Sequence, residues 1–140
     1  MPKILVLDDS PIFRDIVTQV IADTLPGYRQ LVCGTAQEAI RAYDDNVPWD
    51  EGDMAMMDIR MKEGPNGFAV SNYIREKNPL VRRCMLTSYD LDAYREAAHG
   101  DGANFLVKDD LLRLTEYLKN AGKRRAGKRI GESGAADAAF

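Results

Sequence analysis

Apolar residues along this chain follow two patterns that alternate. Short, nearly continuous apolar runs are typical of strands buried on both faces of a parallel sheet. Between them lie segments whose apolar residues recur every three or four positions, as on one face of a helix. The alternation predicts five strand–helix units. The predicted strands are Lys3–Leu7, Gln30–Cys33, Met54–Met57, Arg83–Leu86 and Phe105–Val107.

Capping residues mark the ends of the predicted helices. Ser10-Pro11 opens the first helix with a hydroxyl cap and a proline in the first turn. The segment Thr35-Ala-Gln-Glu38 is a capping box for the second helix. Asp109 or Asp110 caps the last helix, and Gly122 marks its end. The predicted apolar face of the first helix consists of Ile12, Phe13, Ile16, Val17, Val20 and Ile21.

Consecutive parallel strands are joined by right-handed crossovers, so five such units form a sheet with helices on both faces. The common solution for five strands is the flavodoxin-like order 2-1-3-4-5. We therefore expect an α/β, doubly wound (βα)5 domain over residues 1–121. Residues 122–140, rich in Gly, Ala, Lys and Arg, are expected to form a flexible tail.

Length and composition agree with one globular domain. The 140 residues are 45% hydrophobic and 29% charged, which suffices for a hydrophobic core. No apolar run approaches the roughly 20 residues needed to span a bilayer, and the N-terminus does not resemble a signal peptide. We therefore expect a cytoplasmic protein with no membrane partner, in which Cys33 and Cys84 are buried free thiols.

The charge is unevenly distributed along the chain. Residues 1–121 carry a net charge of −6, whereas residues 122–140 carry +3. An acidic body argues against nucleic acid as a partner of the domain, because binding phosphates requires a basic surface.

Polar residues stand at or just after the ends of four of the predicted strands. Asp8-Asp9 follows the first, Asp58 the third, Thr87 ends the fourth and Lys108 follows the fifth. The carboxyl ends of parallel strands gather at one edge of the sheet, where ligands bind. Three carboxylates, a hydroxyl and an ammonium are thus expected to form one pocket.

The chemistry of this pocket suits a hard cation and a phosphoryl group. Clustered carboxylates repel unless a cation neutralises them, and oxygen ligands without His or Cys favour Mg²⁺ or Mn²⁺. We expect Asp9, Asp58 and the backbone carbonyl of Arg60 to bind the metal, with Asp8 acting through water. Asp58 is the candidate nucleophile for an aspartyl phosphate. Lys108 and Thr87 are placed to contact phosphoryl oxygens, and the small Ser88 leaves the approach open.

In these features the sequence resembles the receiver domain of two-component response regulators, including the single-domain chemotaxis receivers. The resemblance implies that a sensor histidine kinase or a histidine phosphotransfer protein passes a phosphoryl group to Asp58. It implies that Phe105 turns inward on phosphorylation and that the face of the fourth helix, fifth strand and fifth helix then signals to a protein effector, or forms a homodimer. The matching segments are Ile4–Ser10, Met57–Met61, Leu86–Ser88 and Phe105–Asp109.

Two departures from the family pattern concern the loop after Asp58. The family usually has a Met-Pro step and a Gly eight residues beyond the phosphorylated Asp, whereas here Lys62 follows Met61 and Gly67 lies nine beyond. A loop one residue longer is expected. Arg60 and Tyr89 lie where residues govern the lifetime of the phosphate, and their bulk predicts slow hydrolysis.

Other functions fit parts of the pattern. The chain could be the receiver fragment of a longer DNA-binding transcriptional regulator. A haloacid-dehalogenase-like, Mg²⁺-dependent aspartyl-phosphate phosphatase also uses Asp, a hydroxyl and Lys, but it requires Asp-x-Asp, and Ser10 stands where the second Asp would fall. A degenerate receiver that only binds partners is disfavoured because all five site positions are chemically intact.

Overall fold

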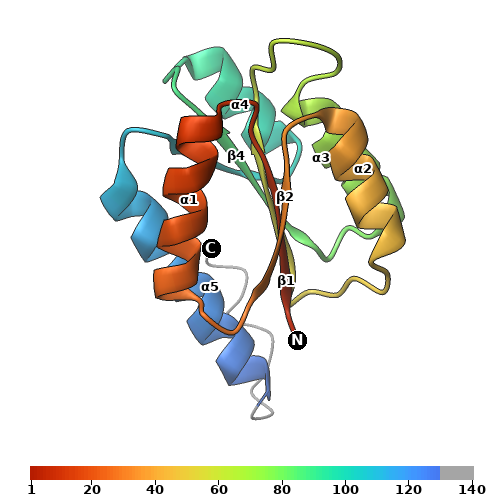
Figure 1. The fold of residues 1–140 in the computed structure, drawn as a ribbon, viewed down its shortest axis with the longest axis vertical. Coiled ribbons are helices and arrows are strands. Elements are labelled where there is room, and N and C mark those ends of the chain that lie inside the picture. Colours follow the sequence, from red (N-terminus) through yellow and green to blue (C-terminus); the bar gives the residue numbers. More distant parts are fainter. Residues whose placement is uncertain (130–140) are drawn as a thin grey trace.

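The computed structural model, which describes residues 1–129, is a five-stranded sheet between two layers of helices (Figure 1). The strand order is β2-β1-β3-β4-β5, and neighbouring strands are parallel. The predicted flavodoxin-like fold and strand order are therefore confirmed. The elements are β1 (Lys3–Leu7), α1 (Pro11–Thr24), β2 (Arg29–Cys33), α2 (Ala36–Asp45), β3 (Met54–Asp58), α3 (Gly67–Lys77), β4 (Arg82–Thr87), α4 (Asp92–Gly100), β5 (Asn104–Val107) and α5 (Leu111–Arg129).

Each face of the sheet has its own apolar core. Helices α1 and α5 pack on one face, and α2, α3 and α4 pack on the other (Figure 1). In β1, Ile4 and Val6 belong to the first core, whereas Leu5 and Leu7 belong to the second. Because both faces are covered, the strands need apolar residues at every position, which accounts for the continuous apolar runs in the sequence.

The packing of α1 corrects one prediction. Val17 and Ile21 are fully buried, with Phe13 and Val20 partly buried against them. Ile12 and Ile16, predicted on the same face, are instead 75% and 39% exposed. The i, i+4 spacing occurs in two adjacent stripes of this helix, and the sequence pattern does not distinguish which stripe faces the sheet.

The predicted caps form, but the last helix continues beyond its predicted end. The Ser10 hydroxyl accepts a hydrogen bond from the Phe13 N–H at 3.3 Å, and Asp110, not Asp109, caps α5 through the Arg113 N–H at 3.0 Å. Helix α5 runs to Arg129, so the prediction that Gly122 ends it is wrong. A single glycine costs a helix only about 1 kcal/mol, and the adjacent Ala121 is buried against the core.

The rest of the predicted tail, residues 130–140, lies outside the described residues, and the domain boundary after residue 121 stays a prediction. Cys33 and Cys84 are buried free thiols, as predicted. Within residues 1–129, no helix is both long and apolar enough to cross a membrane.

Candidate functional site

The polar residues at the strand ends meet at the carboxyl edge of the sheet, as the topology requires. Asp8 follows β1, Asp58 and Thr87 are the last residues of β3 and β4, and Lys108 follows β5. Asp8, Asp58 and Thr87 are all buried. Buried polar groups are rare unless they are paired or bind a ligand, so their position indicates a site rather than a solvated surface.

Three carboxylates form the centre of the site. One oxygen each from Asp8, Asp9 and Asp58 lies within 4.8 Å of the others. Among the described residues, this is the single cluster of His, Cys, Asp or Glu with a geometry that could hold a metal ion. The donors are all oxygens, and carboxylates this close need a compensating cation. The donor set therefore fits a hard divalent ion such as Mg²⁺.

Lys108 supplies a cation to the same group. Its Nζ lies 2.6 Å from Asp8 Oδ2 and 2.9 Å from Asp58 Oδ2. It also lies 4.6 Å from the centroid of the Phe13 ring on α1. Burial alone would lower the pKa of Lys108, but its hydrogen bonds to Asp8 and Asp58 outweigh that effect and raise the pKa. The lysine is therefore a permanent charge that bridges two of the three carboxylates.

Asp58 is less acidic than an ordinary aspartate. Its pKa is raised from 3.8 to about 6, mainly by burial and also by the nearby Asp8, against the lowering effect of Lys108 and of the Arg60 N–H. Without a metal, a large fraction of Asp58 is thus protonated near pH 6. A nucleophile needs its carboxylate form, so a bound cation would both hold Asp58 in place and keep it ionised.

This pKa shift predicts a pH-dependent cost of keeping Asp58 ionised. The pKa of Asp58 is higher in the folded than in the unfolded protein. The protonated Asp58 therefore stabilises the fold at low pH, and this contribution is lost as pH rises through about 6. In metal-free buffer, the stability of Asp58→Asn relative to wild type is expected to increase between pH 4 and 6, by up to about 3 kcal/mol, and then level off.

Urea unfolding at a series of pH values measures this difference directly. Asp45→Asn, at an exposed position of α2, is the matched control, because it removes one carboxylate outside the site. A flat profile for Asp58→Asn would contradict the prediction.

The loop after β3 is tied to the acid pair by a contact that the sequence reading missed. The backbone N–H of Lys62 donates to Asp9 Oδ2 at 2.6 Å, across 53 residues. The Arg60 N–H donates to Asp58 Oδ1 at 3.3 Å. A proline at position 62 would have no N–H to donate. The replacement of the family's Met-Pro step by Met61-Lys62 was therefore the signal that could have revealed this bond.

Arg60 and Tyr89 form the outer wall of the site. The Arg60 guanidinium lies 4.3 Å from the centroid of the Tyr89 ring, in cation–π geometry. The Tyr89 N–H donates to the Thr87 hydroxyl at 3.1 Å. Together these residues border a cavity of about 300 Å³ above the carboxylates. Its lining consists of Asp9, Asp58, Arg60, Met61, Lys62, Thr87, Ser88, Tyr89 and Lys108.

The structure thus brings together all the predicted metal and phosphate residues except one. Asp8 lies beneath the cavity, where it contacts Lys108. Phe105 lies away from it, half-buried on β5, with the Arg95 guanidinium 4.6 Å from its ring centroid. Phe105 is therefore not part of the lining of this cavity.

A parallel sheet of this order, with an acidic pocket and a lysine at its carboxyl edge, defines the receiver class of signalling domains. The sequence model of the response regulator receiver domain matches residues 4–119. The chain belongs to this family, whose members are in general phosphoacceptors rather than enzymes. Comparison with curated protein sequences gives no significant match.

Solved structures share the fold of this chain. The response regulator TrrA from Thermotoga maritima, crystallised with Mg²⁺ and BeF, is 27% identical, with a TM-score of 0.66 over 84% of this chain and 99% of that one. Chemotaxis protein CheY4 from Vibrio cholerae is 22% identical, with a TM-score of 0.67 over 84% and 98%. The N-terminal domain of a Wolinella succinogenes protein is also 22% identical, with a TM-score of 0.76 over 91% and 99%.

Proposed function

We propose that this chain receives a phosphoryl group on Asp58 from the phosphohistidine of a sensor kinase or phosphotransfer protein. The observation that carries the proposal is the meeting of Asp58, Asp9 and Lys108 at one open cavity, with Asp8 beneath it in contact with Lys108. An Asp58 carboxylate oxygen forms a bond to phosphorus while the bond from phosphorus to the donor's imidazole nitrogen breaks. The imidazole leaves neutral once it has taken up a proton.

A divalent cation would complete this site. Asp9, Asp58 and the backbone carbonyl of Arg60 are the proposed ligands of Mg²⁺ or Mn²⁺, with Asp8 acting through water. The similar TrrA structure contains Mg²⁺ and BeF, which supports this assignment. When bound, the ion offsets the negative charge of the carboxylates and of the incoming phosphoryl group.

The remaining residues are proposed to hold the phosphoryl oxygens. Lys108, already 2.9 Å from Asp58 Oδ2, needs only to exchange a carboxylate oxygen for a phosphoryl oxygen. The Thr87 hydroxyl, and beside it the exposed Ser88, would donate to another. The stacked pair of Arg60 and Tyr89 restricts the approach of water, so we expect a phosphate that survives for minutes or longer.

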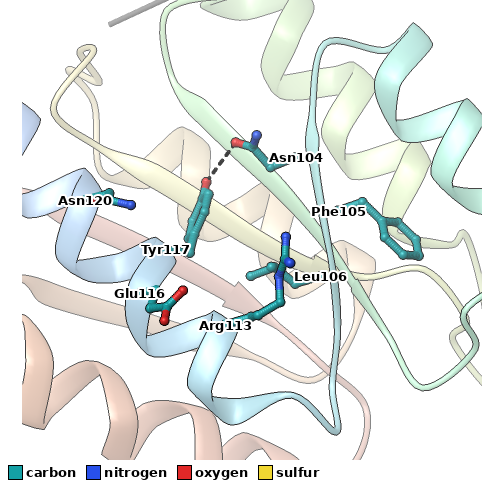
Figure 2. Close-up of a pocket in the computed structure, with 7 residues that line it drawn as sticks. All are labelled: Asn104, Phe105, Leu106, Arg113, Glu116, Tyr117 and Asn120. Carbon is teal, nitrogen blue, oxygen red and sulfur yellow. Dashed lines mark hydrogen bonds between the residues drawn. The ribbon is translucent and has the colours of Figure 1, made fainter. Parts of the chain in front are cut away.

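The output surface is proposed to be the face of α4, β5 and α5, with Phe105 as its link to the pocket. Figure 2 shows this face beside Phe105, where Tyr117 donates to the Asn104 side chain at 3.2 Å. A groove of about 360 Å³ opens there. A protein effector or a second copy of the chain is the proposed partner. The groove is lined by Asn104, Phe105, Leu106, Arg113, Glu116, Tyr117 and Asn120.

Incubation with acetyl phosphate, with and without Mg²⁺, tests the proposal. We expect one phosphoryl group per chain, mapped to the peptide containing Asp58 by mass spectrometry, only when Mg²⁺ is present. Excess EDTA should prevent the modification, because the carboxylates then repel the phosphate. Continuous release of phosphate from many substrates would indicate a phosphatase, and no modification would indicate a binding module.

Loss of the modification within seconds would contradict the role of Arg60 and Tyr89.

A further inference from the structure

The side chain of Arg14 reaches back from α1 to the end of β1. Its Nη1 donates a hydrogen bond to the backbone carbonyl of Asp8 at 2.7 Å. We propose that Arg14 is a positioning residue, which fixes the β1–α1 turn so that Asp9 faces Asp58 across the metal site. The inference rests on the proposed function, because it concerns how that site is preorganised.

Asp8 is held at each of its polar groups. Its N–H donates to the carbonyl of Cys33 at 3.1 Å, its Oδ1 accepts from the Ser10 N–H at 2.8 Å, and its Oδ2 lies 2.6 Å from Lys108. Arg14 satisfies the carbonyl, which is the last of these groups. The carbonyl belongs to the peptide that joins Asp8 to Asp9, so its orientation sets the direction in which Asp9 leaves the strand.

The contact is directed at the backbone and not at a carboxylate. Arg14 has no ion pair with an acidic side chain among those found in residues 1–129. A residue whose role was only to neutralise charge would be expected to face the carboxylates. The geometry of Arg14 therefore indicates that it positions the β1–α1 turn, as is typical of groups that orient metal ligands.

Gly34 makes room for this contact. A Cβ at this position would lie 2.8 Å from Arg14 Nη1, closer than the two atoms can approach. The backbone of Gly34 does not have a positive φ, so alanine is compatible with its conformation. Gly34→Ala should therefore displace the flexible guanidinium and leave the charge of Arg14, and the fold, unchanged. This substitution therefore tests the effect of the position of the Arg14 guanidinium without changing its charge.

The test measures Mg²⁺ affinity by calorimetry with MgCl₂ alone, using full-length protein. Loss of positioning should weaken binding about tenfold in Arg14→Met, the lower end of the range for groups that orient metal ligands, and by a smaller factor in Gly34→Ala, where the guanidinium is displaced but kept. Arg14→Lys, which can still donate to the carbonyl, should recover part of the loss. If Arg14 acted only through its charge, Arg14→Met would change the Mg²⁺ affinity in the opposite direction. Removal of a positive charge near the carboxylates would strengthen Mg²⁺ binding.

Matched controls account for charge and for the added methyl group. Arg41→Met removes one exposed charge from α2, and Gly27→Ala adds a Cβ with no atom within 4 Å. Both should bind Mg²⁺ as wild type does. In metal-free protein, exchange of the Ser10 amide proton should be faster in Gly34→Ala than in Gly27→Ala, a readout that does not depend on the metal.

The outcomes separate this inference from the proposed function. Unchanged Mg²⁺ affinity in Gly34→Ala, or tighter binding in Arg14→Met, overturns the positioning role while wild type still binds Mg²⁺ and accepts a phosphoryl group. Failure of wild type itself to bind Mg²⁺ overturns the proposed function. If Arg14→Met does not fold, Gly34→Ala and the exchange measurement decide the question.

Discussion

Asp58→Asn is expected to abolish phosphoryl transfer to the protein while the fold is retained. The amide has the shape of the carboxylate and can still accept from the Arg60 N–H, but it is not a nucleophile and it removes one charged ligand of the proposed metal site. Transfer from acetyl phosphate in Mg²⁺, followed by intact mass spectrometry, should fall below detection. Circular dichroism of the variant should match that of wild type.

The other carboxylates of the site provide the critical comparison. Asp8 is 1% exposed and paired with Lys108, so a donor cannot reach it. Asp9 lines the cavity and is therefore the alternative acceptor. Modification that persists in Asp58→Asn and maps to Asp9 would contradict the assignment. Asp45→Asn, on the exposed side of α2, is the control and should be modified as fully as wild type.

The site could be predicted from the sequence because it depends on topology. Asp8 and Lys108 directly follow β1 and β5, and Asp58 is the last residue of β3. The strand order alone makes those ends neighbours. The alternation of strands and helices, which is the strongest signal in the sequence, therefore carried most of the functional information. Phe105 was placed on β5 by the same reasoning.

Contacts that depend on the path of a side chain or a loop were not predicted. The bonds from Arg14 to the Asp8 carbonyl and from Lys62 to Asp9, and the stacking of Arg60 on Tyr89, join segments whose relative geometry is set only by tertiary packing. Sequence spacing defines which residues lie on one element. It does not define which atoms of two elements come within hydrogen-bond distance.

Arg83 shows a further limit of the apolar pattern. It was predicted as the first residue of a buried strand, and it is buried at 6% exposure, although it is charged. Its guanidinium pairs with Asp101 at 2.7 Å and donates to the Ser71 hydroxyl at 2.8 Å. This network ties the end of α4 to α3 and β4. Such a buried charge requires its partners, and nothing in the local sequence identifies Asp101 as that partner.

Gly67→Ala is expected to destabilise the protein and to distort the site. A Cβ on Gly67 would lie 2.1 Å from the carbonyl oxygen of Asp58 and 2.8 Å from its carbonyl carbon. Both are backbone atoms, so relief requires that α3 move away from the end of β3. Overpacking of this kind costs about 3 kcal/mol, which corresponds to a decrease in Tm of roughly 10 °C for a domain of this size.

Gly100→Ala is the matched control, because a Cβ there has no atom within 4 Å. Its Tm should equal or slightly exceed that of wild type, since alanine favours helix more than glycine does. The clash at position 67 falls on Asp58, the proposed phosphoryl acceptor and metal ligand, so Gly67→Ala should also weaken Mg²⁺ binding at temperatures where it remains folded. Wild-type stability in Gly67→Ala would show that the approach of α3 to β3 is looser than this geometry, and the glycine would then need another explanation. If stability falls but Mg²⁺ affinity does not, the packing of α3 and the geometry of Asp58 are independent of each other.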